Sequence, residues 1–368
     1  MPDSLAAERR ARLRAALAEA GLQALVVYGN AWQGDYLRYL GGFASLEGHA
    51  VAIAAADGGV TIYLDNLVEA GRARAECPEI AAEWAPDIIA AVEAHLARIG
   101  NQAIGAAPAG HLPRRLAARL ADGMLQDATR ILDRLLADKL PGELAAVRRA
   151  ADMADRGYAV FRAAARAGRP QYALVADVEA FFRAAGCPDN FQILGSGGIE
   201  VRGMAPPGER RLEAGDLVTT ELTPCVDGYY AQICRTLVLG EPSPEQRAAF
   251  AVFHAAMEAG IAAVRPGATA ADVARAENDV FRRHGLGDYV TSEFTRVRGH
   301  GLGLFPDGKP ALLEDVTTVL APGMTLVVHP NTYHPKVGYM VLGDSVVVTE
   351  RGCEVLTRTP RELFSVPA

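Results

Sequence analysis

The second half of this 368-residue chain contains one succession of elements twice. A helical stretch ends at Gly168-Arg169-Pro170 and is followed by a second helix, and the same order recurs around Arg265-Pro266-Gly267. Each copy then leads into apolar, strand-like segments. Two copies fall short of the roughly three that a solenoid needs. The repeat therefore predicts two similar α/β halves that face each other across a pseudo-twofold axis with a pocket between them; the alternative is chance similarity between alanine-rich helices.

The first part of the chain alternates strands and helices. A short β-branched run covers residues 24–28, and two further runs, 51–54 and 60–64, flank the turn signal Asp57-Gly58-Gly59 and predict a hairpin. Helical stretches follow at about 86–99 and 112–121. This alternation predicts a small α/β domain over residues 1–138. Pro141 and Gly142 mark the connection to a second domain, residues 139–368.

Composition limits the partners of the chain. Half of the residues are hydrophobic and 22% are charged, which is typical of globular domains. The net charge of −7 argues against nucleic acid and anionic membranes as partners. No apolar run approaches the roughly 20 residues of a membrane span. Because the N-terminus lacks the apolar core of a signal peptide, we expect a cytoplasmic protein.

Three β-rich segments, 216–239, 295–304 and 324–356, are predicted to line the pocket between the halves. All three contain polar residues within apolar strands. Such residues cost free energy when buried unless they are partnered or functional. The chemistry of the protein is therefore expected on these segments.

Four stretches, taken in chain order, resemble the pita-bread superfamily of creatinase, prolidase and aminopeptidase P. They are residues 35–43 (DYLRYLGGF), residues 215–236 (from Gly-Asp-Leu-Val to Cys-Arg-Thr), residues 299–304 (GHGLGL), and residues 322–324 with 346–352. The resemblance implies a mixed α/β (α+β) fold. It consists of a small N-terminal creatinase-like domain and a C-terminal pita-bread domain with two pseudo-symmetric halves.

Peptidases of this superfamily hold two metal ions on two Asp, one His and two Glu. By resemblance, the two Asp positions fall on Glu221 and Gln232, and the His position falls on His300. The two Glu positions fall on His329 and Gly343. Gln232 is a neutral ligand and Gly343 has no side chain, whereas a dinuclear site needs several carboxylates to neutralise two dications. The sequence therefore predicts that the dinuclear site has been lost.

The remaining set, Glu221, His300 and His329, is predicted to be catalytic. It could be a mononuclear metal triad or a metal-free acid–base site. A Glu at the first Asp position and a His at the first Glu position resemble ectoine hydrolase, and this resemblance favours the metal-free interpretation, with no cofactor. We therefore expect a hydrolase of a C–N bond in a small nitrogenous metabolite, such as an amidine, a guanidine or a cyclic amide.

In that mechanism, His300 or His329 would activate water or protonate the leaving nitrogen. Glu221 would pair with a cationic group of the substrate or act as the base. The expected substrate contacts are Gln232, which can form hydrogen bonds without adding charge, Met204 and Asp307 at two family His positions, and Tyr333 at the pocket rim.

Two other functions stay open. One is an Xaa-Pro peptidase or aminopeptidase-like metalloenzyme with a single divalent metal on the same three residues, and the other is a non-catalytic binding protein. The resemblance also implies a homodimer in which Trp32, Tyr36 and Tyr39 reach the neighbouring subunit's site. The alternative is that these aromatic residues fill the core of the N-terminal domain.

Overall fold

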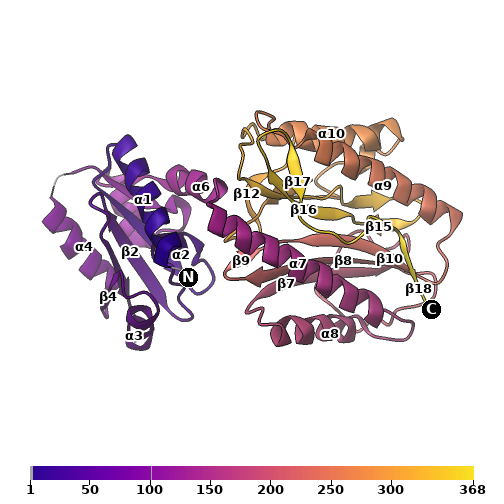
Figure 1. Ribbon diagram of the computed structural model, residues 1–368, viewed down its shortest axis with the longest axis horizontal. Helices are drawn as coiled ribbons and strands as arrows, with labels where there is room; N and C mark the ends of the chain where they lie inside the picture. The colour runs from indigo at the N-terminus through magenta and orange to yellow at the C-terminus, as the bar shows by residue number, and fades with distance from the viewer. Residues whose placement is uncertain (1–2, 101) are drawn as a thin grey trace. The chain divides into compact units, whose positions relative to one another are not determined.

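The computed structural model describes residues 3–100 and 102–368 and contains two compact units (Figure 1). The first unit ends at Leu136 and the second begins at Ala137, beside the connection expected at residues 138–143. Each unit is a mixed α/β structure, so the predicted fold class is confirmed.

The N-terminal unit is built around a six-stranded sheet with the order β4-β3-β2-β1-β5-β6. Its strands are β1 (Ala24–Asn30), β2 (His49–Ala55), β3 (Val60–Leu64), β4 (Ala81–Trp84), β5 (Ile104–Ala107) and β6 (Gln126–Asp127). Its helices are α1 (Asp3–Glu19), α2 (Asp35–Gly41), α3 (Leu67–Glu76), α4 (Ile88–Ile99), α5 (Arg114–Ala121) and α6 (Thr129–Ala137). The predicted hairpin is confirmed, because β2 and β3 are antiparallel and Ala54 is opposite Val60.

The three aromatic residues expected at a subunit interface have different environments within this unit. Tyr39 is 1% exposed and belongs to the core. The hydroxyl of Tyr36 donates to the carboxylate of Asp133, whereas Trp32 is 89% exposed. Tyr39 therefore serves the core of its own domain, and a contact with a second subunit stays a prediction for the other two.

The C-terminal unit carries one ten-stranded sheet whose main path is β12-β11-β13-β16-β10-β8-β7. The strands are β7 (Asn190–Gly197), β8 (Leu217–Val226), β9 (Tyr229–Tyr230), β10 (Ile233–Leu239), β11 (Gly299–Gly301), β12 (Gly308–Ala311), β13 (Thr325–Val328), β16 (Gly343–Val348), β17 (Cys353–Val355) and β18 (Phe364–Val366), with β14 (Thr332–His334) and β15 (Gly338–Met340) as a separate pair. The helices are α7 (Pro141–Ala164), α8 (Gln171–Ala184), α9 (Pro244–Ala263) and α10 (Ala270–Arg283).

The two helix pairs cover different parts of this sheet (Figure 1). Helices α7 and α8 share an apolar core with β8 and β10, and helices α9 and α10 share another with β13 and β16. Each pair therefore belongs to its own half of the domain, as the sequence repeat predicts.

Each half contains an equivalent turn that is held by a backbone hydrogen bond within that half. Gly168 donates to the carbonyl of Leu212 at 2.8 Å, and Gly267 donates to the carbonyl of Leu320 at 3.0 Å. Both glycines have a φ of +82°, a left-handed conformation that favours glycine. The repeated Gly in Gly168-Arg169-Pro170 and Arg265-Pro266-Gly267 therefore marks one turn used twice.

The segment 295–304 forms less strand than expected. Only Gly299–Gly301 pair as β11, and the register shifts between His300 and Gly301. Gly299 and Gly303 have φ values of +143° and +152°, which interrupt an ordinary extended strand. A Cβ on Gly301 would lie 2.0 Å from the carbonyl oxygen of Lys309, so the neighbouring backbone tolerates no side chain there. These glycines let the backbone around His300 pass close to both adjacent strands.

Within the described part of the chain, no helix has the length and apolar character required to cross a membrane.

Replacing Gly301 with Ala should destabilise the C-terminal domain by about 1–3 kcal/mol, because the new methyl group would overlap with a rigid backbone. Urea unfolding followed by circular dichroism measures this change. Gly352→Ala is the matched control, since a Cβ at Gly352 meets no atom within 4 Å. It should change the free energy of unfolding by less than about 0.5 kcal/mol. Equal effects of the two substitutions would contradict the steric explanation.

Candidate active site

Three distant segments bring Glu221, His300 and His329 together. Glu221 lies on β8, His300 on β11, and His329 directly follows β13. One donor atom of each lies within 4.8 Å of the others, and the two imidazole rings are 5.5 Å apart between centroids. All three line a cavity of about 540 Å³. The structure thus places the three predicted catalytic residues at one point.

Burial controls the charges in this cluster. It raises the pKa of Glu221 to about 7, although Arg296 and Gln232 act in the opposite direction. It lowers the pKa of His300, and it lowers the pKa of His329 well below the ordinary value, with the proximity of His300 as a further cause. Both imidazoles are therefore neutral near pH 7. Neutral imidazole nitrogens and a carboxylate are suitable ligands for a divalent transition metal.

Hydrogen bonds indicate which imidazole atoms are available. The Nδ1 atom of His300 lies 3.0 Å from the carbonyl oxygen of Gly301. Because a carbonyl oxygen only accepts, Nδ1 carries the proton and Nε2 is left with a lone pair. His329 differs, since its Nδ1 is buried without a hydrogen-bond partner among the described residues. An unpartnered buried nitrogen next to a second imidazole and a carboxylate is what a metal-binding position requires.

By the resemblance given above, Gln232 falls at a position where a peptidase of the superfamily has an anionic ligand. Its Nε2 donates to Glu221, and its Oε1 accepts from the hydroxyl of Thr223 at 3.3 Å. The amide therefore orients the carboxylate of Glu221 and adds no negative charge. The predicted substrate contact through this amide stays a prediction.

By the same resemblance, the second replaced ligand falls on Gly343, which is closely packed. A Cβ built on Gly343 would lie 2.8 Å from Cβ of His329 and 2.9 Å from Sγ of Cys234. No side chain fits there unless these neighbours move. Because Gln232 is neutral and Gly343 leaves no room for a side chain, these residues do not fit a pair of divalent ions. Glu221, His300 and His329 fit a single divalent ion.

The predicted substrate contacts separate into two groups. Met204, Gln232 and Asp307 line the cavity. Tyr333 does not belong to its described lining: its hydroxyl donates to the carbonyl of Ile199 at 2.7 Å and its ring stacks on Phe294. In the β14–β15 pair, Tyr333 is opposite Tyr339, and Tyr339 is the residue that lines the cavity. A substrate contact of Tyr333 stays a prediction.

Several lining residues were not identified from the sequence. Arg202, Phe294, Arg296, Asn331 and Tyr339 all line the cavity. Arg296 forms an ion pair with Asp307 at 2.5 Å. Arg296 and Asn331 lie four residues before His300 and two after His329, so proximity in the chain was the one available signal. Their orientation depends on strand pairing that the local sequence does not reveal.

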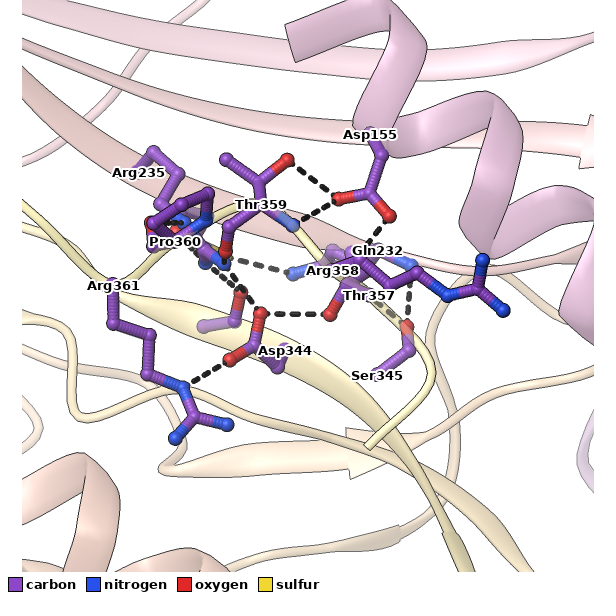
Figure 2. Close-up of polar contacts among 12 residues, drawn as sticks. Asp155, Gln232, Arg235, Asp344, Ser345, Thr357, Arg358, Thr359, Pro360 and Arg361 are labelled. Carbon is purple, nitrogen blue, oxygen red and sulfur yellow. Dashed lines mark hydrogen bonds and ion pairs between the residues drawn. The ribbon is translucent and has the colours of Figure 1, made fainter. Parts of the chain in front are cut away.

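Next to Gln232, a polar network around Arg235 and Asp344 joins the strands β10 and β16 (Figure 2). The fully buried guanidinium of Arg235 donates to Asp344 at 2.7 Å and to the carbonyls of Gly343 and Thr359 at 2.7 and 2.6 Å. The other oxygen of Asp344 accepts from Arg361 at 2.5 Å. The network therefore ties β10, β16 and the C-terminal segment together directly beside the site.

This two-halved domain with a polar cavity defines a protein of the pita-bread class. A model of metallopeptidase family M24 matches residues 145–350, and a model of the creatinase/prolidase N-terminal domain matches residues 9–135. The chain belongs to this metallopeptidase family, so the predicted superfamily is confirmed. The prediction that it belongs to the metal-lacking creatinase and ectoine hydrolase branches is not confirmed.

Named relatives refine the comparison. The chain is 30% identical to the probable dipeptidase PepE of Mycobacterium tuberculosis over 98% of this chain and 96% of that protein. It is 30% identical to the Xaa-Pro dipeptidase of Pyrococcus furiosus over 61% of this chain and 64% of that protein. The crystal structure of dipeptidase PepE from Mycobacterium ulcerans is 29% identical, with a TM-score of 0.85 over the full length of both chains.

These findings correct two predictions. The main functional prediction, a hydrolase of a non-peptide C–N bond, is wrong because the relatives are named as dipeptidases. The prediction of no cofactor is wrong because the family is one of metallopeptidases and Glu221, His300 and His329 form a possible metal-binding cluster. Both errors came from the count of replaced ligands and from the resemblance to ectoine hydrolase, because neither shows that the remaining donors converge.

Replacing Asp344 with Asn should cost about 3–5 kcal/mol of unfolding free energy, because it leaves the buried Arg235 without its counter-charge. Burial raises the pKa of Asp344, but Arg235 and Arg361 together hold it below the ordinary value. The stabilisation is therefore present above about pH 4, the unfolded pKa, and is lost as the pH falls through the lower folded pKa.

Urea unfolding at several pH values between 7 and 3 measures both effects. The pH-dependent loss should be smaller in Asp344→Asn than in the wild type. Asp152→Asn changes a mostly exposed carboxylate on α7 and should follow the wild type. Parallel curves for the wild type and Asp344→Asn would contradict the assignment.

Proposed function

We propose that this protein is a metal-dependent dipeptidase of the Xaa-Pro dipeptidase type with one divalent ion per chain. The observation that carries the proposal is the convergence of Glu221, His300 and His329 at the cavity. There, Nδ1 of His329 is buried and has no hydrogen-bond partner among residues 3–100 and 102–368. The names of the relatives support dipeptides as substrates. Membership of a metallopeptidase family supports the metal.

Glu221, His300 and His329 would hold the ion, which would supply Lewis-acid polarisation of a carbonyl and a water molecule of lowered pKa. The chain's own residues prepare this position. The carbonyl of Gly301 orients the imidazole of His300, and the amide of Gln232 orients the carboxylate of Glu221. Metal binding must compete with protonation of Glu221, whose raised pKa lies near 7.

The rest of the cavity suits a small peptide. Phe191, Ile193 and Phe294 supply apolar lining, and Arg296 with Asp307 supplies both signs of charge. A dipeptide carries one apolar or polar side chain at each position and both terminal charges. The cavity volume of about 540 Å³ lies within the ordinary range for small-molecule sites.

Three finer statements belong to the same proposal. Residues 139–368 form the catalytic domain and residues 1–138 form an accessory domain. The protein acts as a homodimer on a small-molecule substrate. It acts in the cytoplasm, with neither nucleic acid nor a membrane as partner, in line with its net charge of −7.

Calorimetric titration of metal-free protein with Mn²⁺ tests the stoichiometry, and we expect one ion per chain. His300→Ala and His329→Ala should each weaken binding at least about tenfold, because two protein ligands hold a divalent ion poorly compared with three. His254→Ala is the control: this partly buried histidine of α9 lies outside the cavity lining and should bind Mn²⁺ as the wild type does. Two ions per chain, or none, would contradict the one-metal site.

Turnover tests the activity separately. With Mn²⁺, the wild type should release free amino acids from dipeptides that have proline in the second position, and His300→Ala should lose nearly all of kcat/KM. A chain that binds one Mn²⁺ but hydrolyses no dipeptide would favour the non-catalytic alternative and refute the peptidase proposal.

A further inference from the structure

The two halves of the C-terminal domain meet where β10 pairs with β16, because β10 packs with α7 and α8 and β16 packs with α9 and α10. The backbone ladder between the two strands contains two residue pairs, Ile233 with Asp344 and Cys234 with Gly343. Extended by one residue, the same register places Gln232 opposite Ser345. The metal-binding cluster spans this junction, since Glu221 lies on β8 and both of its histidines belong to the other half.

The side chain of Ser345 bridges the two strands at this position (Figure 2). Its Oγ accepts from the amide N–H of Gln232 at 2.8 Å and donates to the carbonyl of Gln232 at 2.9 Å. One hydroxyl can form both bonds, because it has one proton to donate and two lone pairs to accept. Ser345 is 0% exposed and Gln232 is 2% exposed. Loss of the hydroxyl would therefore leave a buried N–H and a buried carbonyl without these bonds.

Ser345 is itself fixed in the row of the sheet that carries His300. It pairs with Val327 across β16 and β13, and Val327 pairs with His300 across β13 and β11. The carbonyl of Ser345 also accepts from the amide of Leu356 at 2.8 Å. The hydroxyl therefore joins Gln232 to a backbone row whose position relative to His300 is set by strand pairing.

Gln232 transmits this position to the carboxylate of the site. Its Nε2 donates to Glu221, and its Oε1 accepts from the hydroxyl of Thr223 at 3.3 Å. Both of those residues lie on β8, so Gln232 is bonded through its backbone to one half and through its side chain to the other. A side-chain amide reaches only as far as its own backbone allows. The placement of the amide against Glu221 therefore depends on the bridge from Ser345.

We propose that Ser345 is a positioning residue. Its hydroxyl holds Gln232 at the junction of the two halves, so that the amide of Gln232 presents the carboxylate of Glu221 to the two imidazoles. Contacts that orient a metal ligand commonly change metal affinity by about 10–100-fold. The effect on metal affinity rests on the proposed function, whereas the position of the Gln232 amide requires no metal.

Thr236 provides a matched control at the other end of the ladder. The register of β10 and β16 places it opposite Val341. Its Oγ1 donates to the carbonyl of Val341 at 2.8 Å and accepts from the amide of Val341 at 3.0 Å. Both residues are 0% exposed, and neither belongs to the described cavity lining. Thr236 therefore forms the same kind of buried bridge between the same segments without a link to Gln232.

The test uses Ser345→Ala and Thr236→Val in the full-length protein, titrated with Mn²⁺ by calorimetry and unfolded in urea. Both variants should unfold at a lower urea concentration, because each leaves a buried N–H and a buried carbonyl without their hydroxyl. Only Ser345→Ala should bind Mn²⁺ more weakly, by at least about tenfold. If Ser345→Ala fails to fold, Ser345→Cys, whose thiol bonds only weakly, takes its place. Wild-type affinity in the Ser345 variant, or an equal loss in Thr236→Val, would overturn the proposal.

A double-mutant cycle shows whether Ser345 acts through Gln232. Ser345→Ala is added to Gln232→Ala and should weaken Mn²⁺ binding no further, since the amide that the hydroxyl positions is already gone. Losses that multiply would show that Ser345 affects the site by another route and would overturn the proposal.

A measurement without metal separates this inference from the proposed function. If the wild type binds no Mn²⁺, the one-metal proposal fails, and nitrogen–proton NMR of the side-chain amide of Gln232 decides the positioning role. Its signals, identified by their loss in Gln232→Ala, should be displaced in Ser345→Ala and keep their wild-type position in Thr236→Val. Unchanged signals in Ser345→Ala would refute the inference on its own.

Discussion

The guanidinium of Arg235 is the group around which the C-terminal domain is organised. It has five N–H donors, and each has an acceptor: the carbonyls of Cys234, Gly343, Thr359 and Pro360 and the carboxylate of Asp344. A cation with no exposed surface is tolerated only when such bonds and a counter-charge replace its hydration. Because those acceptors lie on β10, β16 and the C-terminal segment, the three segments are held together at this point. β16 also pairs with β13, so the strand that leads to His329 depends on the same network.

The chemistry of the site follows from the donor residues that lie beside this network. Superfamily peptidases place several anionic ligands here, whereas this chain places a neutral amide at Gln232 and a packed glycine at Gly343. The single remaining carboxylate, Glu221, faces two imidazoles that burial keeps neutral. One divalent ion balances such a donor set far better than two. The family fold is therefore compatible with this donor set, since the network that holds the strands uses none of Glu221, His300 and His329.

Much of the fold could be predicted because local sequence patterns indicate its turns, strands and helices. The Gly-Arg-Pro and Arg-Pro-Gly turns indicated two halves, and the two glycines do adopt the same left-handed turn. The run around Asp57-Gly58-Gly59 indicated a hairpin that the structure contains. The orientation of single side chains could not be predicted in this way. Tyr333 and Tyr339 are opposite each other in one strand pair, and no local pattern shows which of them lines the cavity.

The sequence by itself determined the order of the elements, the two-halved domain and the identity of the polar residues on the pocket strands. By resemblance, it also predicted which metal ligands of the superfamily are replaced, because residue identity at a motif position is readable without coordinates. The tertiary structure alone decided that Glu221, His300 and His329 meet within 4.8 Å and that Nδ1 of His329 has no hydrogen-bond partner in the part of the chain that the structure describes. Metal binding depends on the distance between donors that are 79 and 29 residues apart along the chain (300 − 221 and 329 − 300). Such distances are set by strand pairing and by buried charges, not by the local sequence around each donor.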